Sequence, residues 1–378
     1  MKWASIIAKP KRLDDAVDQA CEDLSAALGG ETPDLVFAFA SGQYATHFER
    51  LPELIQERLP GAILVGCSAG GVVGGGEEIE QLPGLSLTGA ILPGVKITPF
   101  HVPADLSEKS DLWGIQDDEP THFVLLTEPF GCDTPDLLSN LDMAFPGSPV
   151  VGGIASGGEQ PGTTALFLLD RVIRTGAVGV ALQGDIVMDT MVAQGCRPVG
   201  DPMFITRGES NAIYELDGRP AGDLLREVYL SCSEKEQLLF QYALFLGVVI
   251  QEGQETYEQG DFLIRPVIGM DPDNNIVAVG SEVRNNQVVQ FHLRDANASS
   301  VDLKSHLSTF RQARQGDDTV GALMFSCLGR GVALYGESGH DSELFAEQLP
   351  EVALGGFFCN GEIGPVQGRL HVHAYTSS

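Results

Sequence analysis

Four residues near the C-terminus, Cys327, Arg330, Asn360 and Glu362, carry side chains that could bind or transform a small molecule. Cys327 and Arg330 follow the apolar run 322–325, which predicts a buried strand, and Asn360 and Glu362 follow a second such run. Loops beyond strand ends are where α/β proteins bind small ligands. We therefore expect a thiol, a guanidinium, an amide and a carboxylate at one edge of a sheet.

Arg330 and Glu362 suit an amino acid as ligand, because a guanidinium pairs bidentately with a carboxylate and a carboxylate accepts hydrogen bonds from an ammonium group. The alternative is that the two side chains pair with each other and brace two loops. Cys327 also has two interpretations. A nucleophilic thiol needs a base or a cation beside it, and no histidine lies near it in sequence, so a buried structural thiol is favoured.

Residues 66–70 satisfy the pattern G-x-S-x-G after an apolar strand, as a hydrolase nucleophile would. That motif requires a helix immediately afterwards, and the sequence GVVGGGEE is a very poor helix former. We therefore favour a loop in which backbone N–H groups, Cys67 and the small hydroxyl of Ser68 approach a ligand. Ser41, which ends the preceding apolar strand, is expected at the same edge.

The same order of elements occurs three times. Apolar runs at 36–39, 123–126 and 322–325 are each followed by helical material, a Leu-Pro or Phe-Pro pair, a second apolar run and a glycine-rich loop. Thr134 is predicted to cap one of these helices, with Pro135 at its first position. Pro52 is predicted to start a second helical piece after a kink. The sequence therefore predicts repeated β-α-β-loop-β units.

The middle of the chain predicts different structure. Strands are expected at 178–181 and 186–192, and the polar, Gly- and Pro-rich segment 195–220 is interpreted as a domain junction. Beyond it we expect helices at 221–231 and 234–243, and strands at 246–251, 262–268, 276–283 and 288–293. The predicted fold class is α/β, with two domains, 1–220 and 221–378, and mixed sheets.

Composition narrows the class of protein. The chain has 378 residues, which is enough for two cores, and 43% of them are hydrophobic. The net charge of −29 argues against nucleic acid or an anionic membrane as partner. The seven cysteines include no C-x-x-C pair, as expected for reduced thiols, and no signal peptide or long apolar run is present. We expect a soluble cytoplasmic protein.

No cofactor motif stands out. His371 and His373 share one face of a predicted strand, but no third ligand is spaced to complete a metal site, so we expect no metal. The loop GGIASGGEQPG lacks the spacing and the following helix of a dinucleotide fingerprint. A single haem ligand such as His340 leaves no recognisable pattern. We therefore predict no cofactor.

Several long motifs resemble one family. FSCLGRG at 325–331, GGFFCNGEIGP at 355–365 and the terminal HVHAYT resemble the C-terminal half of the FIST domain. The sequences GCRPVGDPMFITRG and NAIYELDGRPA resemble the end of its N-terminal half, which places the boundary near Ala221. The resemblance implies a sensory domain of signal transduction that binds small molecules such as amino acids. Some proteins similar to this domain are haem-based nitric-oxide sensors.

The hypothesis is a sensory protein, not an enzyme, that binds a small polar ligand such as an amino acid and signals to a separate protein. Two alternatives stay open, a thiol- or serine-dependent hydrolase or transferase using Cys327 or Ser68, and a haem-based gas sensor. The predicted ligand-binding residues are Ser41, Cys67, Ser68, Cys327, Arg330, Asn360 and Glu362.

Overall fold

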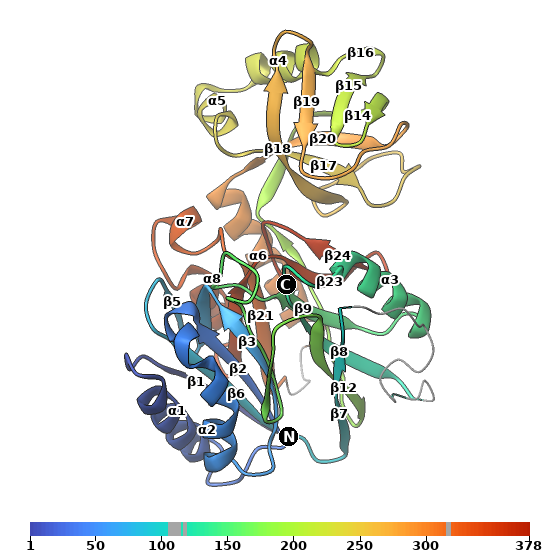
Figure 1. Ribbon diagram of the computed structural model, residues 1–378. Helices are drawn as coiled ribbons and strands as arrows, with labels where there is room; N and C mark the ends of the chain where they lie inside the picture. Colours follow the sequence, from blue (N-terminus) through green and yellow to red (C-terminus); the bar gives the residue numbers. More distant parts are fainter. Residues whose placement is uncertain (105–114, 116–118, 315–318) are drawn as a thin grey trace. The chain divides into compact units, whose positions relative to one another are not determined.

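Three parallel strand pairs, each joined through helical structure, organise the computed structural model (Figure 1). The structure describes residues 1–104, 115, 119–314 and 319–378. The chain forms two units. Unit 1 comprises residues 1–192, 304–372 and 377–378, and unit 2 comprises residues 193–303 and 373–376. The predicted α/β class with mixed sheets is confirmed.

The first sheet of unit 1 contains the first parallel pair. Its strand order is β1 (Lys2–Ala8), β6 (Leu85–Ile91), β2 (Leu35–Ser41), β3 (Ile63–Ala69), β10 (Leu166–Leu168) and β11 (Arg171–Ile173). Between β2 and β3 the chain forms the 3-10 helix η1 (Gly42–Arg50) and then α2 (Leu51–Arg58). Pro52 lies in the first turn of α2, as predicted, where its missing N–H costs no intrahelical bond.

The second sheet contains the pair β8–β9. Its order is β24 (Arg369–His373), β23 (Glu362–Val366), β9 (Val150–Ile154), β8 (Thr121–Thr127), β12 (Ala177–Gly184) and β7 (Val95–Val102). Helix α3 (Thr134–Ala144) joins β8 to β9. The predicted cap residue of this helix was wrong. Asp133 is the N-cap and accepts a hydrogen bond from the backbone N–H of Asp136, while the Thr134 hydroxyl donates to Thr127.

The third sheet joins distant parts of the sequence. In unit 1 its order is β25 (Thr376–Ser377), β21 (Gly321–Cys327), β22 (Ala353–Cys359), β4 (Gly71–Gly74) and β5 (Glu77–Glu80). Helices α7 (Val332–Tyr335) and α8 (His340–Gln348) connect β21 to β22, and α6 (Ala296–Ala313) precedes β21. β22 pairs antiparallel with β4, and β23 pairs antiparallel with β9. For this reason the units do not coincide with the predicted ranges 1–220 and 221–378.

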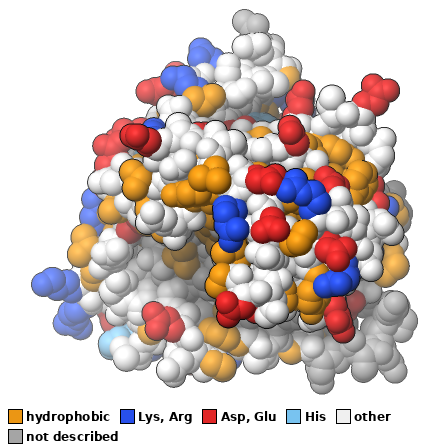
Figure 2. Space-filling view, turned by 90° about the horizontal axis from the view of Figure 1, so that it is seen from above, with side chains coloured by type: hydrophobic (Ala, Val, Ile, Leu, Met, Phe, Trp, Pro, Cys, Tyr) orange, Lys and Arg blue, Asp and Glu red, His pale blue; other side chains and the backbone are white. Residues whose placement is uncertain are grey.

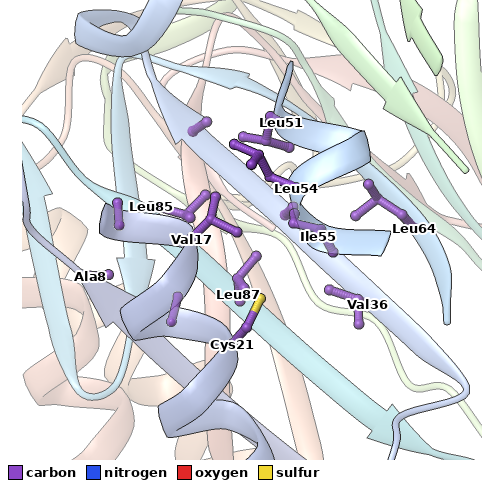
Figure 3. Close-up of a cluster of buried hydrophobic side chains, with 14 of the residues drawn as sticks. Ala8, Val17, Cys21, Val36, Leu51, Leu54, Ile55, Leu64, Leu85 and Leu87 are labelled. Carbon is purple, nitrogen blue, oxygen red and sulfur yellow. The ribbon is translucent and has the colours of Figure 1, made fainter. Parts of the chain in front are cut away.

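The hydrophobic core of unit 1 lies on both faces of the first sheet. Helices α1 (Leu13–Ala27) and α2 cover one face, and α1 presents a buried stripe at helical spacing (Figure 3), namely Leu13, Ala16, Val17, Ala20, Cys21 and Leu24. On the other face, a second cluster takes side chains from all three sheets. There the Phe39 ring of β2 stacks on Phe357 of β22, with ring centroids 4.7 Å apart.

Unit 2 is built around a small barrel. The strand order is β14 (Cys196–Glu209), β20 (Val288–Arg294), β17 (Leu244–Val249), β18 (Phe262–Asp271), β19 (Ile276–Val279), β15 (Ala212–Leu216) and β16 (Arg219–Pro220), and a β14–β15 pairing closes it. The unit also contains β13 (Ala193–Gln194), α4 (Ala221–Ser231) and α5 (Glu234–Phe240). α4 has the predicted bounds.

The interpretation of residues 195–220 as a junction was wrong, because they form three strands of this barrel. β14 is mostly exposed on one side, so its sequence is polar. Its ladder with β20 is interrupted between Val199 and Met203, and the irregularity accommodates Gly200 and Pro202.

The strand predicted at 186–192 was also wrong. These residues form no ladder, although Ile186 and Met188 pack against the second core cluster. The apolar residues of this segment therefore reflect contact with the core, without strand pairing.

Figure 2 shows the charged side chains on one face of the molecule. On the face shown in Figure 2, acidic side chains lie among basic and apolar ones. This face presents no continuous acidic patch.

A glycine permits close backbone approach in each parallel pair. A Cβ atom added to Gly66, Gly152 or Gly356 would lie 1.9, 1.7 or 1.9 Å from the carbonyl oxygen of Ala38, Leu125 or Met324, the residue aligned with it in the ladder. Gly152 and Gly356 also have φ values of 155° and 150°, which L side chains rarely adopt. These positions therefore require glycine.

We predict that Gly356→Ala destabilises the chain by about 3 kcal/mol or more, because the backbone of β21 or β22 must move to relieve the clash. Urea denaturation measures the free energy of unfolding. Gly269→Ala is the matched control, since a Cβ there meets nothing within 4 Å. Equal stability of the two variants would contradict the prediction.

Candidate functional site

The loops that follow β2, β3 and β9 meet at one edge of unit 1. A Cβ on Gly42 would lie 2.3 Å from the carbonyl oxygen of Gly157, and one on Gly157 would lie 2.4 Å from that of Ala69. The backbones of three loops are therefore in direct contact. Parallel strands bring their carboxyl ends to the same edge, as the sequence analysis assumed.

Ser156 ties this edge to the C-terminal segment. Its buried hydroxyl donates to the carbonyl oxygen of Phe358 in β22 and accepts from the backbone N–H of Gly70 at 2.8 Å. Its carbonyl oxygen accepts from the hydroxyl of Ser68 at 2.8 Å. Ser156 was not among the predicted site residues; the one signal for it in the sequence is a serine in the glycine-rich loop after β9.

Three of the predicted site residues are buried and engaged within the protein. The Ser41 hydroxyl accepts from the backbone N–H of Gly84 at 2.9 Å, and the Ser68 hydroxyl accepts from that of Ala165 at 3.0 Å. Cys67 belongs to the core, and burial raises the pKa of its thiol well above the usual value. These side chains hold the loops in place.

Two predicted residues lie within reach of solvent. Cys327, at the end of β21, is half-buried. Asn360 is exposed, and its side-chain NH2 group donates to the carbonyl oxygen of Ala155 at 2.8 Å. The oxygen of the same amide is a hydrogen-bond acceptor. Beside them, Leu328 covers Gly70 and is 38% exposed. Together with the glycine backbones, these residues form the accessible part of the edge.

Arg330 pairs with Asp341, a residue the sequence analysis did not select. Both side chains are buried, with 0% and 1% exposed, and Nε and Nη2 of Arg330 lie 2.7 and 2.9 Å from the two carboxylate oxygens. Although burial opposes ionisation, Arg330 lowers the pKa of Asp341 through its charge and hydrogen bonds. The alternative in which Arg330 braces Glu362 is therefore wrong.

Glu362 lies elsewhere along this edge. It is fully buried at the start of β23, and the thiol of Cys359 lies 3.4 Å from its Oε1. The structure thus places Arg330 and Glu362 in separate buried contacts, and neither carries its charge at the surface.

Two carboxylates of β5 cap the helices that connect β21 to β22. Glu78 accepts from the backbone N–H groups of Gly339 and Ser342, at 3.0 and 2.8 Å, at the start of α8. Glu80 accepts from the N–H of Val332 at 3.0 Å, at the start of α7. Helix N-termini carry unsatisfied backbone N–H groups and a partial positive charge. These carboxylates accept hydrogen bonds from the N–H groups and place a negative charge beside the positive end of each helix.

Glu78 is a buried acid with an unusual pKa. Burial, and then the negative charge of Asp341, raise the pKa of Glu78 to about 6. The hydrogen bonds from Ser342 and Gly339 favour the charged form and offset only part of this rise. Sequence reasoning missed Glu78 because its partners are more than 250 residues away.

Glu128 is another buried carboxylate, directly after β8. Its Oε2 accepts from the backbone N–H groups of Phe130 and Gly131, and its Oε1 accepts from the Thr164 hydroxyl at 2.8 Å. The sequence analysis did not select it. It orders the loop between β9 and β10 against the end of β8.

Both parts of this arrangement match known domain families. Residues 34–219 match the FIST N domain, and residues 221–365 match the FIST C domain. The chain belongs to the FIST family. FIST domains are associated with sensory signal transduction, and the family is not one of enzymes.

Two curated relatives are similar to nearly the whole chain, and a third is similar to part of it. The uncharacterized protein Rv0628c of Mycobacterium tuberculosis is 35% identical over 367 residues, which cover 96% of this chain and 94% of the relative. The uncharacterized protein Mb0898c of Mycobacterium bovis is 33% identical over 96% of this chain and 93% of its own length. The F-box/LRR-repeat protein At5g63520 of Arabidopsis thaliana matches 34% of this chain at 30% identity, over 26% of its own length.

Two further observations concern the FIST chain as a whole. Among the described residues, no helix combines the length and the apolar composition needed to span a membrane.

His340, the haem-ligand candidate, begins α8 with its ring stacked on Tyr335 at a centroid distance of 3.7 Å. A haem-binding role for His340 stays a prediction.

The Arg330–Asp341 pair should dominate the local stability. We predict that Arg330→Met costs about 3–5 kcal/mol in urea denaturation, because it leaves Asp341 buried without its cation. The double variant Arg330→Met/Asp341→Leu should recover part of this loss. Lys304→Met is the control, since the exposed Lys304–Glu347 pair is worth less than about 1 kcal/mol. Similar losses in the two single variants would refute the assignment.

Glu78 should make stability depend on pH between 4.5 and 6. Because its folded-state pKa is raised, protonation of Glu78 stabilises the fold; this contribution is complete below pH 4.5 and is lost as pH rises through about 6. Acidification across this window should stabilise the native chain relative to Glu78→Gln by about 2 kcal/mol. Urea denaturation at both pH values measures it. Glu22→Gln, on the exposed side of α1, controls for the change in net charge. A difference independent of pH would disprove the effect.

Proposed function

We propose that this FIST protein is a sensory component that binds a small polar ligand, an amino acid or a derivative of one, at the edge of unit 1 where its loops converge. The observation that carries the proposal is the Ser156 connection, which joins loops after β3 and β9 to the end of β22. A ligand at this edge contacts segments from both FIST matches at once.

The chemistry of the edge supports a small polar ligand. Glycine-rich loops allow a ligand to approach backbone N–H groups closely. Asn360 adds the amide of an exposed residue, and Cys327 adds a half-buried thiol. Arg330 contributes to ligand binding only if it releases Asp341. In this proposal the ligand contacts mainly Asn360, Cys327 and the loop backbone. The remaining candidates are buried and hold these groups in place, namely Ser41, Cys67, Ser68 and Glu362.

Signalling follows from a difference in affinity between two states. A ligand shifts a conformational equilibrium only as far as it prefers one state. The loops of this edge are fastened to α7 and α8 through β4 and β5, so a ligand that moves Gly70 also moves the carboxylates that cap both helices. In the proposal, a separate protein recognises the changed surface.

The experiment is a thermal-shift screen of the purified chain against the standard amino acids and small carboxylates, after its absorption spectrum has been recorded. A ligand at one hundred times its Kd adds about 2.7 kcal/mol and raises Tm. We predict that this shift is lost in Asn360→Ala and in Gly70→Ala, whose new methyl group displaces only the flexible Leu328 side chain.

Asn140→Ala is the control variant, because Asn140 lies on α3 and bonds only to Asp136 among the contacts described for it. It should keep the full thermal shift. A shift that persists in both edge variants would place the ligand elsewhere. A panel without any active compound would count against an amino acid ligand. Product formation abolished by Cys327→Ala would favour the enzyme alternative, and a Soret band would favour a haem sensor.

A further inference from the structure

Two cysteines end neighbouring parallel strands side by side. Cys327 and Cys359 are the last aligned pair in the ladder between β21 and β22, which begins at Gly321 and Ala353. Neighbouring strands lie about 4.8 Å apart, and disulfides form across Cα separations of about 4.4–6.8 Å. The backbone spacing is therefore suitable for a disulfide bond.

The two side chains also point to the same face of the sheet. Phe325 and Phe357, aligned two residues earlier, make an edge-to-face contact with ring centroids 5.8 Å apart. Side chains two residues apart on a strand share a face, so the thiols of Cys327 and Cys359 follow these rings on the same side. Neither cysteine takes part in a disulfide bond among the described residues.

Their surroundings give the two thiols different roles. Cys327 is half-buried beside the exposed Leu328, so a small oxidant in water reaches it first. Cys359 is fully buried, and its Sγ lies 3.3 Å from the carbonyl oxygen of Ser326 and 3.4 Å from Oε1 of Glu362. Burial, and then the charge of Glu362, raise the pKa of Cys359, so this thiol needs an acceptor for its proton before it can react.

We propose that Cys327 and Cys359 form a reversible dithiol–disulfide site that reacts with hydrogen peroxide, with Glu362 accepting the proton of Cys359. The Cys327 thiol ionises, and its thiolate attacks one peroxide oxygen; an S–O bond forms and the O–O bond breaks. The departing hydroxide takes up the proton that the Cys327 thiol released and becomes water. Cys359 then passes its proton to Glu362, and its sulfur displaces the hydroxyl group from Cys327 as the S–S bond forms. That proton completes a second water, so peroxide is reduced and the two thiols are oxidised.

The other cysteines do not offer this arrangement within the described residues. In their ladders, Cys67 is aligned with Phe39 and Leu166, and Cys196 with Arg294. Cys132 and Cys232 are half-buried like Cys327 but lie outside the strands. They serve as internal controls for accessibility.

A disulfide here would change the edge proposed for ligand binding. It would fix the ends of β21 and β22 to each other and remove the Cys327 thiol. The redox site stands on the ladder register and the contacts of Cys359, so it does not depend on the proposed sensory function.

The first test is peptide mapping by mass spectrometry, without reductant, after the folded chain has been treated with hydrogen peroxide. We expect one peptide pair linked through Cys327 and Cys359, lighter by two hydrogen atoms and released by excess glutathione. Cys132 and Cys232 should react with thiol reagents without forming a link. Oxidation of Cys327 to sulfinic acid in the absence of a link, or a link to another cysteine, would overturn the proposal.

Two variants test the roles of the partners. In Cys359→Ala, Cys327 should stop at the sulfenic acid, which dimedone traps. In Glu362→Gln, formation of the sulfenic acid should be unchanged, while disulfide formation should slow about tenfold or more, because the proton acceptor is lost. An unchanged rate would remove Glu362 from the mechanism. If Cys359→Ala fails to fold, mapping of the native chain still decides whether the link forms.

Discussion

Strand β22 is the element on which unit 1 depends. It pairs with β21, its neighbour in sequence, on one side and with β4, from residues 71–74, on the other. The first pairing is parallel and brings Gly356 against the backbone of Met324. The second pairing places the hairpin of β4 and β5 beside the segment between β21 and β22, which contains α7 and α8. The loop edge, the buried Arg330–Asp341 pair and the carboxylate caps all follow from these two pairings.

The electrostatics of unit 1 follow the same logic. A chain with a net charge of −29 repels itself, and each buried carboxylate adds a desolvation cost. Glu78 and Glu128 offset this cost with hydrogen bonds from backbone N–H groups at a helix start and a turn, and Asp341 offsets it by pairing with a guanidinium. The buried carboxylates therefore lie where backbone N–H groups or a guanidinium can donate hydrogen bonds to them.

The sequence predicted the elements better than the contacts between them. Apolar runs ending in glycine located the three parallel pairs, and Ala221 was recognised as a helix start. The strands of 195–220 were missed, because a barrel strand with one exposed side has a polar sequence. The loops after β2, β3 and β9 meet at one edge, and several of the residues selected as ligand-binding candidates are buried within the protein. Asp341 and Ser156 could not be predicted, since the partners of a side chain depend on which loops meet, and no periodicity in the chain encodes that.

The carboxylates of β5 have a consequence for the evolution of the chain. Glu78 and Glu80 complete helices that lie about 250 residues later, and β4 covers an edge of β22 that would otherwise present free N–H and C=O groups to other molecules. The two FIST matches are contiguous in sequence yet share one sheet. A gene rearrangement that exchanged one half would have to bring a compatible hairpin with it, so the halves are expected to be inherited together.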